Sequence, residues 1–184
     1  MGPGVTYETI LPLRCAVVAV VPGAAELAAL NADNEDLLRT LSVLEEFPPD
    51  LTDEHPDVVH ELRRIDFKLN LVLELVSQVL ARELAVPERV RASISAAGME
   101  WHTAGQAPAV RSYVALDLYM HPRYPRALRL LARVQAVHPD AQGTRVAVVF
   151  EQLSESVSDW LTRIVFVHHR RQVALARRGH GASD

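Results

Sequence analysis

The sequence predicts an α+β protein with a six-stranded antiparallel β-barrel, a C-terminal helix and a long coiled-coil helical insertion. Three observations support this fold class. Short stretches that alternate apolar and polar residues, as half-buried strands do, occur throughout residues 86–153. A heptad pattern occupies residues 58–79, and an apolar helical pattern occupies residues 156–178. The 184 residues, 49% of them hydrophobic, suffice for one well-buried domain, which we expect to span the whole chain.

Composition excludes several classes of protein. A net charge of -4 with 23% charged residues argues against a disordered chain and against a protein that binds nucleic acid polymers. The apolar run Cys15–Val21 is much shorter than the ~20 residues of a membrane span, and no Lys/Arg-led leader precedes it. The single cysteine excludes an intramolecular disulfide and thiolate zinc signatures. We therefore expect a cytoplasmic protein with no membrane contact, no metal and an unreactive, buried Cys15 thiol.

Charge is distributed unevenly along the chain. Residues 26–61 contain eleven acidic residues and one basic residue, whereas residues 62–184 contain seventeen basic and eleven acidic residues. Lysine occurs only at Lys68, so nearly every cation is an arginine. A biased genome composition explains this pattern, and the alternative is that some arginines bind phosphates or carboxylates.

The first elements along the chain are a strand and a helix. Residues 11–21, rich in valine, predict a buried strand that ends at Pro22 and Gly23. A helix or broken helix pair is expected over residues 24–47. Its apolar face consists of Leu27, Leu30, Leu37, Leu41 and Leu44.

A second helix, over residues 54–84, carries the most regular pattern in the sequence. Its seam residues follow one another at steps of 4, 3, 4, 3, 4 and 3: Val58, Leu62, Ile65, Leu69, Val72, Val76 and Val79. The mean spacing of 3.5 residues predicts a left-handed coiled coil. If Leu62 is heptad position a, then Leu69 and Val76 are also at a, and the other four seam residues are at d. Leucine at two of the a positions with β-branched residues at d disfavours two-stranded parallel coils and favours three or four helices.

This helix would span ~46 Å, too long for one small domain to cover. Five further apolar residues widen its apolar surface: Phe67, Leu71, Leu73, Leu75 and Leu80. We expect the seam to build a homo-oligomer, with the preceding helix or the rest of the chain covering the other residues. The alternative is that the helix packs only within its own subunit.

The remaining chain predicts β-strands and a closing helix. Five strands are expected at residues 89–95, 99–103, 110–120, 128–138 and 144–152, with Trp101 in the core. Ser156 or Ser158 is expected to cap the final helix. Its apolar face comprises Val157, Leu161, Ile164, Val165, Val173 and Leu175. The neighbouring His168 and His169 cannot both face one metal from a helix, so we expect them at the surface.

Four stretches in this order resemble a known family. They are an opening strand (LPLRCAVV), the turn SISAAG followed by Met-Glu-Trp, a last strand (GTRVAVVFEQL) and a C-terminal helix (SDWLTRIVF). Together they resemble the PilZ domain family of bacterial cyclic di-GMP receptors. The resemblance covers residues 10–21 and 86–178, and the helical block of residues 22–84 is then an insertion. This insertion is similar to that of the atypical, tetramer-forming PilZ subfamily.

The resemblance implies cyclic di-GMP as a ligand, but the ligand motifs differ from the family pattern. The R-x-x-x-R segment that precedes the barrel in the family is missing, because residues 1–13 contain no arginine. The literal match, Arg129 to Arg133, falls inside a predicted strand. At the first position of the family's [D/N]-x-S-x-x-G turn stands Ser93, while Ser95 and Gly98 remain.

Two function classes follow from these residues. In the first, the chain is a tetrameric receptor or adaptor with a non-standard nucleotide site formed by Arg89, Arg91, Ser93, Ser95 and Gly98. In the second, it is a ligand-free scaffold for protein partners that dock on the acidic first helix or on the arginine-rich C-terminal helix. The alternative for Arg89 and Arg91, which the sequence favours, is that they are exposed strand arginines. The alternative for Ser93–Gly98 is an ordinary hairpin turn. No catalytic motif is present, so we expect no enzyme.

Overall fold

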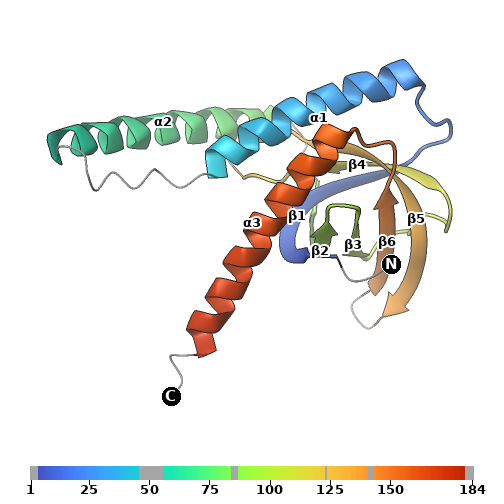
Figure 1. Cartoon of the computed structure of the whole chain (residues 1–184). Helices are drawn as coiled ribbons and strands as arrows, with labels where there is room; N and C mark the ends of the chain where they lie inside the picture. Colours follow the sequence, from blue (N-terminus) through green and yellow to red (C-terminus); the bar gives the residue numbers. More distant parts are fainter. Residues whose placement is uncertain (1–3, 46–55, 84–86, 123, 141–142, 181–184) are drawn as a thin grey trace.

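The computed structural model describes residues 4–45, 56–83, 87–122, 124–140 and 143–180. The elements follow the order β1 (Thr6–Val17), α1 (Ala24–Glu45), α2 (Pro56–Glu83), β2 (Arg89–Ser95), β3 (Gly98–Thr103), β4 (Tyr113–Leu118), β5 (Leu128–Asp140), β6 (Gly143–Phe150) and α3 (Glu155–His180). The strands form a closed antiparallel barrel in the order β1-β2-β3-β6-β5-β4 (Figure 1). The predicted six-stranded barrel is therefore confirmed.

The long strand β1 closes the barrel. Its first half, Thr6–Pro12, pairs with β2, and its second half, Leu13–Val17, pairs with β4. The strand was expected to be a buried segment over residues 11–21, and this was wrong in bounds and in burial. Only alternate residues such as Leu11 and Leu13 face the core, because one face of a barrel strand lies outside.

The barrel interior contains the main hydrophobic core. Ile94, Trp101, Leu116, Val134 and Val146 are all buried there, each from a different strand. The alternation predicted for these strands from the sequence therefore describes their inward and outward faces. Trp101 belongs to the core, as predicted, with 3% of its surface exposed.

Helix α1 packs on the barrel and on α3, and lies across one end of the barrel (Figure 1). Leu37, Leu38 and Leu41 are buried beneath it. Gly23 precedes the helix, and the Glu26 carboxylate accepts a hydrogen bond from the Gly23 N–H at 3.1 Å, which caps the first turn.

Two asparagines on α1 bind the backbone below. Asn34, which is buried, donates to the Arg129 carbonyl at 2.6 Å and accepts from the Arg129 N–H at 3.1 Å. Asn31 donates to the Gln152 carbonyl at 2.9 Å and accepts from the Ser154 N–H at 3.1 Å. Each amide therefore satisfies one backbone donor and one acceptor. The leucine pattern had not indicated this polar attachment.

Helix α2 differs from α1, because it extends beyond the barrel (Figure 1). Within the described residues it makes no extensive contact with the barrel or with α1 and α3. The expectation that the chain itself covers Phe67, Leu71 and Leu75 was wrong, since all three are exposed. Leu80 lies outside the residues whose side chains the structure describes.

Helix α3 begins one residue earlier than expected. The Ser154 hydroxyl accepts a hydrogen bond from the Val157 N–H at 3.2 Å, so Ser154 caps the helix, not Ser156 or Ser158. Val157, Leu161, Ile164 and Val165 are buried as predicted. Leu175 is exposed, because α3 continues past the barrel toward the C-terminus (Figure 1).

Candidate functional site

The turn between β2 and β3 is held by a serine side chain. The Ser95 hydroxyl donates to the Gly98 carbonyl at 2.9 Å. It also accepts hydrogen bonds from the N–H groups of Ala97 at 3.3 Å and Gly98 at 3.1 Å. All three bonds are local, as in other serine turns. Ser95 therefore shapes the turn itself.

Gly98 is required by the close approach of β6. A Cβ atom at this position would lie 2.2 Å from the Val148 carbonyl oxygen, which is backbone and cannot move aside. The glycine thus allows β3 to pair tightly with β6. Ser95 and Gly98, two of the predicted ligand residues, have structural roles that explain their presence.

A groove opens beside this turn, with a cavity volume of about 690 Å³. Its floor is formed by the outer faces of β2, β3 and β6, and its walls by the start of β1 and by α3. The lining includes Thr6, Ser93, Gly98, Val149, Thr162 and Phe166. Most of these side chains are small or apolar. The groove therefore suits an apolar ligand surface better than a hydrated one.

The wall formed by α3 is attached to β1 by three side chains. The His168 ring stacks on Tyr7 at a centroid distance of 4.6 Å and an interplanar angle of 16°. His169 Nδ1 donates to the Thr6 carbonyl at 2.7 Å, and Gln172 exchanges two hydrogen bonds with the backbone of Glu8. The expectation of surface histidines was wrong: both are half-buried, because strand and helix meet there.

Arg89 and Arg91 stand apart from the groove. Both are exposed on β2, opposite Pro12 and Ile10 of β1, and neither lines the cavity. Arg91 precedes Ser95 by four strand residues, about 13 Å along the strand. The structure therefore brings Ser93, Ser95 and Gly98 together and leaves the two arginines outside. Their ligand role remains a prediction.

Electrostatically the groove is poor in cations. Among the described lining residues there is no arginine, lysine or histidine, and Glu100 is the one charged side chain. Arg129 and Arg133, the literal R-x-x-x-R match, lie on β5, where Arg133 pairs with Glu151 at 2.8 Å. The lining itself therefore offers no guanidinium partner to the phosphates of a dianionic nucleotide.

Two further groups outside the groove could carry chemistry, a cysteine and a histidine–aspartate pair. Cys15 is half-buried, and burial raises the pKa of its thiol to about 11, which makes it a poor nucleophile at neutral pH. The His102 ring lies 2.8 Å from the Asp140 carboxylate. In the described part of the chain, no three histidine, cysteine or acidic side chains gather closely enough to hold a metal ion.

The seam of α2 is the second candidate site. All seven seam residues named above lie on the described helix, and each is 45–58% exposed. A stripe of half-exposed apolar side chains of this length is unusual in a monomer, since such patches mark interaction surfaces. The structure leaves the seam available to another chain.

Comparison with known proteins now identifies the family. The family described as "Atypical PilZ domain, cyclic di-GMP receptor" matches residues 38–178. The chain belongs to the atypical PilZ family. A comparison with curated proteins finds no match. None of the described helices of this PilZ protein is both long enough and apolar enough to cross a membrane.

Two solved structures resemble the chain. A tetrameric PilZ domain protein from Xanthomonas campestris, self-assembled via a helical bundle, is 27% identical, with a TM-score of 0.70. The match covers 95% of this chain and 90% of that one. The PilZ domain of YcgR from Escherichia coli, solved with cyclic di-GMP, is 22% identical with a TM-score of 0.39, over 48% of this chain and 77% of that one.

Proposed function

We propose that this PilZ protein is a cytoplasmic, homo-tetrameric adaptor of cyclic di-GMP signalling, in which α2 joins the barrels. It acts by binding protein partners and not as an enzyme. The observation that carries the proposal is the exposed heptad seam of a 28-residue helix that its own subunit leaves uncovered. A helix of this type gains most of its stability from packing, so a partner helix is needed.

Two observations bear on the number of subunits: the shapes of the seam side chains and the similarity to a tetrameric protein. Leu62 and Leu69 occupy a positions, and Ile65 and Val72 occupy d positions. This arrangement favours more than two helices in parallel coils. The Xanthomonas campestris protein, which matches over nearly the full chain, is a tetramer built through a helical bundle. The side chains favour three or four copies, and the similarity to the tetrameric protein favours four.

The test is the mass of the particle in solution. Ile65→Glu with Val72→Glu would bury two unpaired charges in the seam, so the tetramer should dissociate into folded monomers. The matched control, His60→Glu with Gln78→Glu, adds two negative charges to exposed positions of α2 outside the seam and should leave the tetramer intact. Sedimentation velocity reports the mass, and near-UV circular dichroism reports the barrel fold.

A wild-type chain that sediments as a monomer would contradict the proposal. So would a seam variant that remains tetrameric while the control dissociates. In that case another surface would hold the subunits together.

Direct binding of cyclic di-GMP is the second candidate function. The observation in its favour is the groove of about 690 Å³ beside Ser93 and the Ser95–Gly98 turn, in a chain of a receptor family. Arg89 and Arg91 would supply cations from the neighbouring part of β2. The groove's own lack of basic side chains counts against this candidate and favours the adaptor.

Calorimetric titration of cyclic di-GMP into the purified protein separates the two candidates. Heat of binding that is lost in Arg91→Ala and in Ser93→Ala would establish the receptor. These positions are preferable to Ser95, because Ser95→Ala would also remove the bonds that hold the turn. No heat at about 100 µM ligand would favour the ligand-free scaffold for protein partners.

A further inference from the structure

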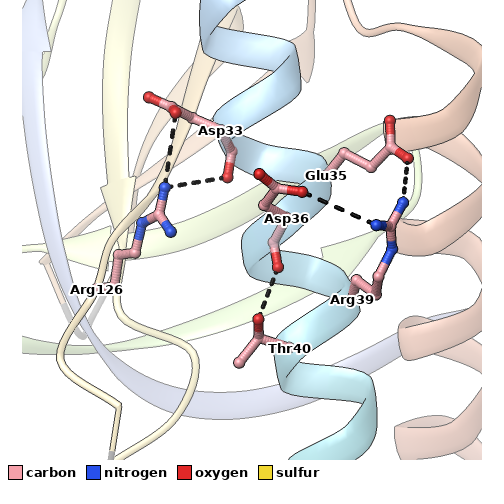
Figure 2. Close-up of polar contacts among 6 residues, drawn as sticks. All are labelled: Asp33, Glu35, Asp36, Arg39, Thr40 and Arg126. Carbon is pink, nitrogen blue, oxygen red and sulfur yellow. Dashed lines mark hydrogen bonds and ion pairs between the residues drawn. The ribbon is translucent and has the colours of Figure 1, made fainter.

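The two charged helices offered by the sequence as docking surfaces differ in how their charges are used. On α1, Arg39 lies 2.8 Å from Glu35 and 4.0 Å from Asp36, and Arg126 lies 3.7 Å from Asp33 (Figure 2). Arg126 also donates to the Asp33 carbonyl at 3.4 Å. The acidic face of α1 is thus partly neutralised by the chain's own arginines. It is the weaker docking surface for a charged partner.

On α3 the cations are arranged differently. The Arg163 guanidinium lies over the Trp160 ring at 5.6 Å, and the Arg170 guanidinium lies over the Phe166 ring at 5.7 Å. Within the described residues neither arginine forms an ion pair with an acidic side chain. Phe166, one turn from each of them, is half exposed. This face therefore presents an aromatic ring between two arginines that form no ion pair with a described residue.

The same face borders the groove. Phe166 and Thr162 line the cavity from α3, and Val165 continues the wall below them. Glu100, the charged residue of the described lining, lies 3.8 Å from Arg145, which offsets its charge. The exposed Glu8 lies on β1 directly opposite Ser93, so a carboxylate also borders the floor on the β1 side. The positive charge beside the groove is confined to the α3 side, where Arg163 and Arg170 flank Phe166.

We propose that this α3 groove is the docking surface for a segment of a partner protein that combines apolar side chains with aspartate or glutamate. The inference rests on the adaptor function proposed above and names the chemistry of its partner. Apolar side chains would displace water from the small-residue floor and pack on Phe166. Acidic side chains would pair with Arg163 and Arg170, which are already oriented by their aromatic rings.

A phage-displayed library of random 16-residue peptides, selected against the wild-type protein, tests the proposal. We expect selected peptides to be enriched in apolar and acidic residues, and to bind in fluorescence anisotropy as synthetic peptides. Phe166→Ala with Arg170→Glu removes the ring and reverses one charge at exposed positions. This variant should weaken binding about tenfold or more.

The chain offers a matched control on α2. Arg63 and Phe67 are also exposed and four residues apart, so Arg63→Glu with Phe67→Ala makes the same two changes away from the groove. Peptide affinity per subunit should stay within about twofold of the wild type. Equal loss in both variants, or basic peptides as the selected class, would overturn the proposal.

Two other occupants would also overturn it. Residues 45–57 of the chain are themselves acidic and include Phe47 and Leu51. Tight binding of a synthetic 45–57 peptide in the groove would assign the surface to a second copy. Displacement of the selected peptides by cyclic di-GMP at the same arginines would assign it to the nucleotide.

Sedimentation of the wild-type protein distinguishes a failure of the docking surface from a failure of the proposed tetramer. A tetramer that selects no acidic apolar peptide overturns the docking surface and leaves the assembly standing. A monomer that selects such peptides overturns the assembly and leaves the docking surface standing.

Discussion

Helices α1 and α2 are neighbours in the sequence, yet they are stabilised in different ways. Helix α1 buries Leu37, Leu38 and Leu41 against the barrel and α3 and attaches two asparagines to backbone groups. Helix α2 leaves its apolar seam half exposed. A surface that fits the chain's own barrel carries irregular leucines and specific polar groups. The proposed assembly accounts for the repeating stripe of α2, because the same spacing must then match on every partner helix.

The largest effect should follow from removing a buried side chain of α1. Leu38 is fully buried, so Leu38→Ala leaves a cavity and should lower the free energy of unfolding by about 3 kcal/mol. Leu69→Ala on α2 is the counterpart. In the dissociated Ile65→Glu/Val72→Glu background it should change the free energy of unfolding by less than about 0.5 kcal/mol.

Chemical denaturation of both variants in the dissociated background measures the two free energies of unfolding. The midpoint should not depend on protein concentration, because this background is monomeric. Equal losses at Leu38 and Leu69 would mean that α2 also packs within its own subunit. The contrast between the two helices would then fail.

A smaller effect is expected from the polar attachment of α1. Asn34→Ala removes both bonds to Arg129 and leaves its partly buried N–H and carbonyl without these partners, which should lower the free energy of unfolding by about 2 kcal/mol. Asn70 on α2 is the counterpart, since it donates to the Asp66 carbonyl of its own helix at 2.9 Å. Asn70→Ala should be close to neutral, since alanine favours the helix. Urea titrations of both variants measure the difference, and a neutral Asn34→Ala would show that the attachment contributes little.

The smallest effect is expected on the reactivity of the Cys15 thiol in β1 when substitutions in α2 break the assembly. Because burial raises the pKa of this thiol to about 11, the thiolate is rare at pH 8, and reaction with a disulfide reagent should be slow. The rate should rise as the pH approaches 11. Ile65→Glu/Val72→Glu should leave this profile unchanged, because α2 makes no extensive contact with the described barrel.

The free energy of unfolding should depend on pH over the same range. The neutral thiol is favoured in the folded state, so its contribution is complete below pH 9.0 and is lost as the pH rises to about 11. Cys15→Ala should remove that part of the pH dependence. A thiol that reacts rapidly at pH 8 only in the dissociated variant would show that α2 does protect the barrel.

The sequence predicted the order of the elements well and the candidate site less well. Strand alternation and the heptad are local patterns, and β2 was placed at residues 89–95 as observed. The roles of Ser95 and Gly98 could not be predicted, because they depend on the turn geometry and on the Val148 carbonyl of β6. The contacts of His168 and His169 depend on residues about 160 positions earlier in the chain.

What the sequence determined by itself was the barrel class, the inserted helices and the seam of α2, since each depends on a period that neighbouring residues encode. Only the tertiary structure decided that α1 is held by the barrel while α2 makes no extensive contact with the described barrel. It also decided that α3 forms one wall of an apolar groove, beside which Arg163 and Arg170 form no ion pair with any described acidic residue. The physical reason is that burial and charge compensation depend on which distant groups meet in space. No local pattern in the chain specifies those meetings.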